Sequence, residues 1–315
     1  MTDQAQSIVI SLKEAIEAEA VRTMAESTLQ KQYGVSCVAM VGSTCRGTFA
    51  ALPVDFDLAV LTEREQKDIP HDVLHAACSE LVMKISSLPP FARYCGSVAA
   101  SSGVVADGAK IELESLGLRG TASLVARYVL VMNGAEQALR YGFLDVTCGR
   151  LPHLLGYEEW MSNHFDQLGP GWAGRLRTEI RLAKAVLAQV EGVYGSKGRG
   201  LRGHAVEQLV IQSRNYRPAS LPIGTFDNAM RLLVEKGGGR RFGEFKVAFP
   251  LWRPGGHDHN GRPVDLWHLL GDGEPRAAED RWLKLIILAT AYQRYASNGH
   301  AWSIQELADV VRDSH

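Results

Sequence analysis

The stretch VGSTCRGTFAALPVDFDLAVL, residues 41–61, decides the fold expected for the first part of the chain. The apolar run 35–41 that leads into it has the length of a strand, and Gly42 and Ser43 break that run. A second short strand is expected over 56–61. The stretch therefore predicts two strands joined by a turn and a loop.

Asp55 and Asp57 lie at the mouth of the second expected strand. Because residues two apart in a strand point to the same face, their carboxylates are aimed at one point. Two neighbouring carboxylates repel each other and raise the pKa of one of them. A hard cation relieves this conflict, and Mg²⁺ takes carboxylate oxygens together with substrate phosphates. The pair therefore predicts a metal site.

The Gly42-Ser43 turn complements the carboxylate pair. Glycine lets a ligand approach the backbone closely, and Ser43 offers a hydroxyl and an N–H group. If a helix begins within 43–50, its N-terminus favours anions, and Arg46 adds a charged donor fork. An anion site beside a dication site suits a nucleoside triphosphate with Mg²⁺.

A third acid is expected from a neighbouring strand. The segment 109–115, AKIELES, alternates apolar and acidic residues, so Glu112 and Glu114 share one face. Either of them could join the aspartate pair in a two-metal site. Such a site activates an attacking hydroxyl and stabilises a leaving pyrophosphate.

The bulk composition is that of a globular protein without a general affinity for nucleic acid. The net charge of the 315 residues is −1, whereas nucleic-acid-binding proteins are usually basic. Five cysteines without a C-x-x-C pair indicate reduced thiols. No apolar run reaches the length of a membrane span, and the N-terminus lacks the bases of a signal peptide. We therefore expect a cytoplasmic protein that does not enter membranes.

The pattern of apolar residues divides the chain near residue 120. Residues 1–120 predict a small α+β unit with one mixed sheet, and residues 121–315 predict a mainly helical domain. In the first unit, helices are expected over 7–32 and 71–87, and strands over 93–105 and 109–116 joined by a hairpin at Asp107-Gly108. In the second, helical spacing covers 121–141, 157–168, 172–192, 203–214, 225–236 and 278–296.

The motif G-S-x-x-R-G-T followed by D-x-D resembles the polymerase-β nucleotidyltransferase superfamily. Residues 179–212 and 224–233 are similar to the helical part of the archaeal-type (class I) CCA-adding tRNA nucleotidyltransferases. This resemblance extends from about residue 35 to 235. It implies a polymerase-β-like nucleotidyltransferase domain followed by a helical domain that binds nucleotide and acceptor.

The resemblance also implies roles for individual residues. In register with the family's third acid, Glu112 is preferred over Glu114. The catalytic and metal-binding set is then Asp55, Asp57 and Glu112, holding two Mg²⁺ ions. The nucleotide-binding set is Gly42, Ser43, Arg46, His153, Lys184 and Tyr194.

The expected activity is template-independent transfer of NMP from CTP or ATP to an acceptor hydroxyl, with release of pyrophosphate. As in CCA-adding enzymes, the acceptor would be an RNA 3′ end such as that of tRNA. We expect no counterpart of that family's C-terminal tail domain, which favours a second possibility, a small-molecule acceptor in a biosynthetic pathway. Glu112 stands where the family usually has Asp, which leaves open a third, a degenerate protein that binds nucleotide or RNA without catalysis.

Overall fold

The computed structural model describes ten stretches of the chain. They are residues 3–101, 110–119, 123–132, 135–149, 152–188, 201–214, 224–257, 261–270, 275–299 and 303–313. The chain forms two compact units, Met1–Glu158 and Glu159–His315. Among the described helices, none is long and apolar enough to cross a membrane.

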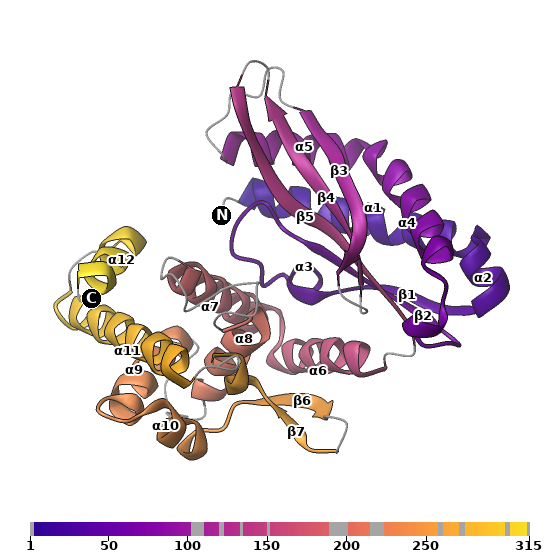
Figure 1. The fold of residues 1–315 in the computed structure, drawn as a ribbon. Helices are drawn as coiled ribbons and strands as arrows, with labels where there is room; N and C mark the ends of the chain where they lie inside the picture. The colour runs from indigo at the N-terminus through magenta and orange to yellow at the C-terminus, as the bar shows by residue number, and fades with distance from the viewer. Residues whose placement is uncertain are drawn as a thin grey trace. The chain divides into compact units, whose positions relative to one another are not determined.

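A five-stranded mixed sheet forms the centre of the first unit (Figure 1). Its strands are β1 (Val35–Val41), β2 (Phe56–Thr62), β3 (Lys110–Arg119), β4 (Ser123–Met132) and β5 (Ala135–Gly149). They lie in the order β1-β2-β5-β4-β3. The β2–β5 pair is parallel and the other pairs are antiparallel, so the predicted α+β class with a mixed sheet is confirmed.

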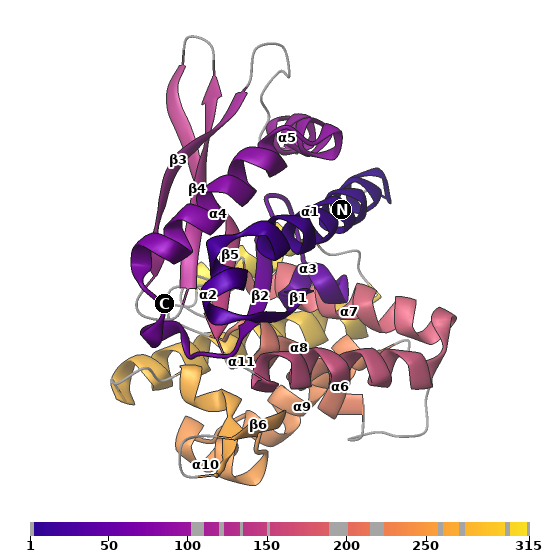
Figure 2. The same cartoon turned by 90° about the vertical axis from the view of Figure 1, so that its right-hand side faces the viewer.

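Helices cover one face of this sheet (Figures 1 and 2). They are α1 (Asp3–Glu26), α2 (Thr28–Tyr33), α4 (His71–Ser86) and α5 (Pro89–Ser101). A short helix, α3 (Gly42–Arg46), follows β1, and the 3₁₀ turn η1 (Gln66–Asp68) follows β2. The predicted helix over 7–32 is thus divided in two, because the Ser27 hydroxyl accepts the Gln30 N–H and caps α2.

Alternate residues of β2 and β5 face the helices and form the core. These are Phe56, Leu58, Val60, Leu144, Val146 and Cys148, each at most 2% exposed. Because side chains alternate along a strand, the residues between them face the opposite side of the sheet. Asp57 and Asp145 are on that opposite side.

The strand expected over 93–105 is wrong for the part of it that the structure describes. Residues 89–101 form helix α5, and Pro89-Pro90, expected to end the preceding helix, begin this one. Proline suits the first turn of a helix because no backbone donor is needed there. Tyr94 and Val98, four residues apart, face the core. The hairpin turn Asp107-Gly108 lies outside the described residues.

The helix expected over 121–141 is also wrong, since β4 and β5 occupy this region. Its apolar residues recur at spacings that suit a helix or a buried strand, and periodicity alone does not separate the two. Pairing of β5 with both β2 and β4 decides in favour of strands. As a result, the predicted boundary at 120 falls inside the sheet, and the two units divide after Glu158 instead.

The second unit is mainly helical, as predicted. Helix α6 (Pro152–Leu168) begins in the first unit and is followed by α7 (Pro170–Ala188), α8 (Gly203–Ser213), α9 (Thr225–Gly237), α10 (Phe242–Ala248), α11 (Pro275–Ser297) and α12 (Ile304–Asp313). A small hairpin of β6 (Trp252–His257) and β7 (Pro263–Asp265) precedes the 3₁₀ turn η3 (Leu266–Leu270). Phe242, Phe245, Trp267 and Trp282 pack together in its core.

Candidate active site

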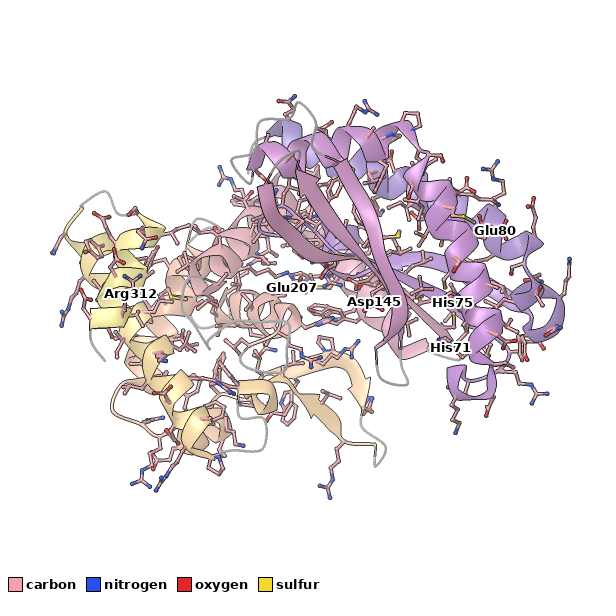
Figure 3. All side chains as sticks on the ribbon, turned by 45° about the horizontal axis from the view of Figure 1, so that its top comes forward. His71, His75, Glu80, Asp145, Glu207 and Arg312 are labelled. Carbon is pink, nitrogen blue, oxygen red and sulfur yellow. The ribbon has the colours of Figure 1, made fainter. Side chains whose placement is uncertain are left out.

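Two aspartates face each other across the β2–β5 strand pair. Asp57 of β2 and Asp145 of β5 are direct partners in the parallel register, and both are half-buried. They lie on the sheet face opposite the helices, and Figure 3 marks Asp145 on its strand. Val41, the last residue of β1, is the other partner of Asp57. The end of β1 therefore lies beside the strand that carries Asp57, and β5 with Asp145 lies on the other side of that strand.

Asp55 lies just before β2 and is exposed. Its backbone carbonyl accepts a hydrogen bond of 2.6 Å from the Thr44 hydroxyl of α3. The residue before it, Val54, is fixed by Tyr94, whose hydroxyl accepts the Val54 N–H and donates to the Val54 carbonyl. Helices α3 and α5 thus position the backbone on which Asp55 stands.

The three aspartates influence one another electrostatically. The pKa of Asp57 is raised to about 7, first by burial and then by the negative charges of Asp145 and Asp55. Arg46 acts in the opposite direction and offsets only part of this effect. The sequence-based expectation of a carboxylate with a raised pKa is therefore met at Asp57, with a contribution from a residue outside the D-x-D motif.

Gly42 is the first residue of α3 and directly follows β1, and a residue with a side chain is disfavoured at this position. Its φ angle is +81°, a conformation that side chains disfavour. A Cβ at this position would also overlap the Asp57 carboxylate. The backbone of the Gly42-Ser43 turn and the carboxylate of Asp57 are therefore in direct contact.

The groups expected to bind triphosphate are partly engaged within the protein. The Gly42 N–H donates to Glu158 Oε1 at 2.8 Å, and Arg46 forms an ion pair with the same oxygen. Arg46 is 6% exposed, so its guanidinium faces protein groups. Ser43 is half-buried at the start of α3, which ends at Gly47 and is shorter than the helix expected within 43–50.

Glu112 is not brought to this site. It lies on β3, which is separated from β2 by β4 and β5. Through the register it pairs with Val129, which pairs with Arg140, five positions before Asp145 on β5. The expectation that β3 is the neighbour of β2 is therefore corrected, and with it the choice of Glu112. Glu114 belongs to the same outer strand.

Asp145 is the acid that the sequence interpretation missed. The segment FLDVTCG, residues 143–149, places one acid within an apolar run, which is a signal of a strand carrying a functional carboxylate. This signal was hidden because the preceding residues were interpreted as helical.

The residues expected to contact nucleotide from the helical part have different placements. Lys184 is 1% exposed, and its Nζ lies 2.8 Å from Glu207 Oε1, a carboxylate that is fully buried. Lys184 is therefore an internal ion-pair partner in this structure. His153 lies in the first turn of α6. Tyr194 lies outside the described residues.

The donor set at the β2–β5 pair suits a hard divalent cation. Asp145 and Asp55 both act on Asp57 electrostatically, and the raised pKa of Asp57 records, after burial, the charge repulsion that a cation would remove. Within the described residues, no three His, Cys, Asp or Glu side chains already converge as a metal-binding group. Substrate phosphates and water would complete the ligand shell, as is usual for Mg²⁺. His71, His75 and Glu80 lie on α4, in the helical layer (Figure 3).

No protein-family model and no curated protein sequence matches the chain. Distant likeness exists to solved structures. The Cid1 poly(U) polymerase with MgGTP bound is 12% identical, with 99% of this chain and 94% of that chain covered and a TM-score of 0.49. E. coli MS115-1 CdnC with ATP is 11% identical, with 99% and 91% covered and a TM-score of 0.49. The non-canonical poly(A) polymerase complex GLD-2–GLD-3 is 12% identical, with 98% of each chain covered and a TM-score of 0.40.

Proposed function

We propose that this chain is an NTP-dependent nucleotidyltransferase in which Asp55, Asp57 and Asp145 hold divalent cations. The observation that carries the proposal is the pairing of Asp57 with Asp145 on adjacent parallel strands, with Asp55 close enough to raise the pKa of Asp57. Asp145 takes the place in the site that the sequence-based hypothesis gave to Glu112.

Holding these carboxylates close together lowers the stability of the folded protein unless a ligand neutralises their charge. Like charges held together at a half-buried site disfavour the folded state at neutral pH. Helix α3, Tyr94 and the strand register nevertheless hold these carboxylates in place. Strain of this kind is typical of binding and catalytic sites, where a ligand relieves it.

The reaction requires no covalent intermediate with the protein. The acceptor hydroxyl oxygen forms a bond to the α-phosphorus of the nucleotide while the bond from that phosphorus to the bridging oxygen breaks. The hydroxyl proton passes to a carboxylate of the site, and pyrophosphate leaves with the electron pair of the broken bond. A cation bound by the carboxylates would supply charge neutralisation for the triphosphate. Ser43 would offer its hydroxyl to a phosphate oxygen, and Asp55, Asp57 and Asp145 would hold the ions.

The donor and acceptor follow from the resemblance to CCA-adding enzymes. We propose CTP or ATP as the donor and an RNA 3′ end as the acceptor, with two Mg²⁺ ions. The net charge of −1 supports a second candidate, a small-molecule hydroxyl acceptor, because it provides no general attraction for RNA.

The test is a transfer assay with a panel of donors and acceptors. Each α-labelled NTP is incubated with Mg²⁺ and either tRNA lacking CCA, another RNA 3′ end or a set of small hydroxyl compounds, and both labelled product and pyrophosphate are measured. Asp55→Asn and Asp145→Asn should each reduce turnover by about 100-fold or more. Glu112→Gln, on the outer strand, is the matched control and should retain activity.

Two results would contradict the proposal. Full activity of Asp145→Asn would remove Asp145 from the site. Nucleotide binding by the wild-type protein without pyrophosphate release for any acceptor would favour the degenerate binding protein.

A further inference from the structure

One carboxylate oxygen serves two groups at the edge of the proposed site. Glu158 Oε1 accepts the Gly42 N–H at 2.8 Å and also pairs with Arg46. Glu158 stands on α6, 112 residues from Arg46 in sequence, so no local pattern joins them. Both partners of Glu158 are groups that the sequence assigns to the triphosphate.

The ion pair is shielded from solvent. The side chain of Arg46 is 4% exposed and that of Glu158 is 14% exposed. The guanidinium carbon of Arg46 lies 5.2 Å from the centroid of the Tyr157 ring, which adds a cation–π contact. The Nη1 group of Arg46 is therefore already paired with a carboxylate in a shielded place, and a phosphate would have to compete with Glu158 for it.

The pair is linked to the metal-binding side of the site through Gly42. The N–H of Gly42 is held by Glu158, while the Cα of Gly42 faces the Asp57 carboxylate with no room for a Cβ between them. A rotation of this peptide would move the surface against which Asp57 rests. Glu158 is therefore linked to the surroundings of Asp57 through the backbone of Gly42.

We infer that Glu158 is a positioning residue for Asp57 and that Arg46 is its buried counterion, not a ligand of the triphosphate. This inference rests on the proposed function for its kinetic consequences. It replaces the role that the sequence gives to Arg46, and it assigns a role to Glu158, which the motif does not contain.

Three variants test this inference. Arg46→Met leaves the Glu158 carboxylate without its arginine, and Glu158→Ala removes the acceptor of the Gly42 N–H. The double variant Arg46→Met/Glu158→Gln removes both charges but keeps an amide oxygen that can accept the Gly42 N–H. Glu159→Gln, at the exposed neighbouring position, is the matched control.

The kinetic readout is the division of the effect between kcat and KM. Arg46→Met should lower kcat about 10-fold or more, and the double variant should recover most of it with KM for NTP within about threefold of wild type. If Arg46 binds triphosphate, both variants lose that contact, and an equal rise in KM of about tenfold or more in both would overturn the inference.

A second readout does not depend on turnover. The rise in melting temperature caused by Mn²⁺ reports cation binding to the folded protein. Glu158→Ala should lose most of this rise, whereas the double variant and Glu159→Gln should keep it. A full Mn²⁺ effect in Glu158→Ala would overturn the inference even if the enzyme transfers nucleotide. A wild-type protein that shows the Mn²⁺ effect but no transfer would contradict only the proposed function, and one that shows neither would contradict both.

Discussion

At the residue scale, Asp57 connects the proposed chemistry with a cost in stability. Its folded-state pKa is raised to about 7 by burial and by its aspartate neighbours. An unfolded aspartate has a pKa of about 4, so between about pH 4 and 7 the folded state binds more protons than the unfolded state. The free energy of unfolding must therefore fall as pH rises through this window and stay lower above it.

Asp57→Asn should stabilise the protein at pH 8 and abolish transfer. The amide carries no charge, so the variant escapes the repulsion from Asp55 and Asp145, and a gain on the order of 2 kcal/mol is expected. The gain should shrink as pH falls towards 4, where the wild-type carboxyl is protonated. Urea unfolding of both proteins at pH 5 and pH 8, in chelator, measures this. A variant less stable than wild type at pH 8 would show that Asp57 does not carry this charge conflict.

The D-x-D spacing predicted Asp55 and Asp57 as a pair on one strand face. Asp55 in fact lies just before β2, where its charge still raises the pKa of Asp57. Asp145 could not be joined to them, since its partner across the parallel register depends on which strands are neighbours. The contacts of Glu158 could not be predicted from the sequence for a similar reason. Its contacts with Gly42 and Arg46 are tertiary and leave no periodic signal in the sequence.

At the element scale, the junction of β1 with α3 at Gly42 packs directly against the Asp57 carboxylate of β2. Gly42→Ala should reduce stability by about 1–3 kcal/mol and lower transfer activity strongly. The added Cβ meets the Asp57 carboxylate, and the φ angle of +81° strains any side chain.

A second glycine provides the control for this variant. Gly96 lies exposed within α5, where an added Cβ meets nothing within 4 Å. Gly96→Ala should raise stability by about 0.5–1 kcal/mol, because alanine loses less entropy in a helix. Thermal unfolding and transfer assays on both variants check the pair. Equal, small effects at the two positions would refute the role given to Gly42.

The elements that were predicted correctly are those with a clear single period or a clear break. Helix α4 and strand β1 are examples, since the first has a helical apolar period and the second ends directly before Gly42. Helix α5 was missed because Pro89-Pro90 can either end a helix or begin one. Strands β4 and β5 were missed because the apolar residues of 121–141 recur at spacings that suit a helix as well as a strand.

At the scale of the whole molecule, each unit has its own buried charge pair. In the second unit, Lys184 and Glu207 are 1% and 0% exposed, and they join α7 to α8 at 2.8 Å. Removing one partner leaves a charge in an apolar interior. We therefore expect Lys184→Met to destabilise the protein by about 3–5 kcal/mol.

The double variant Lys184→Met/Glu207→Leu should recover much of this loss, since both charges are then gone. Lys284→Met on α11 is the control, because its pair with Asp280 is largely solvated and worth less than about 1 kcal/mol. Denaturant unfolding measures all three. If Lys184→Met unfolds like wild type but raises KM for NTP, the phosphate contact suggested by the family resemblance would be favoured over the ion pair.

The parallel pairing of β2 with β5 has a consequence during protein synthesis. A ribosome releases β1, α3 and β2 long before β5, so a nascent chain carries Asp55 and Asp57 without Asp145. Under the proposed function, such a chain has only part of the carboxylate set that would bind cations. If the site acts as proposed, it is complete only after β5 has paired with β2, and chains that end before β5 should lack transfer activity.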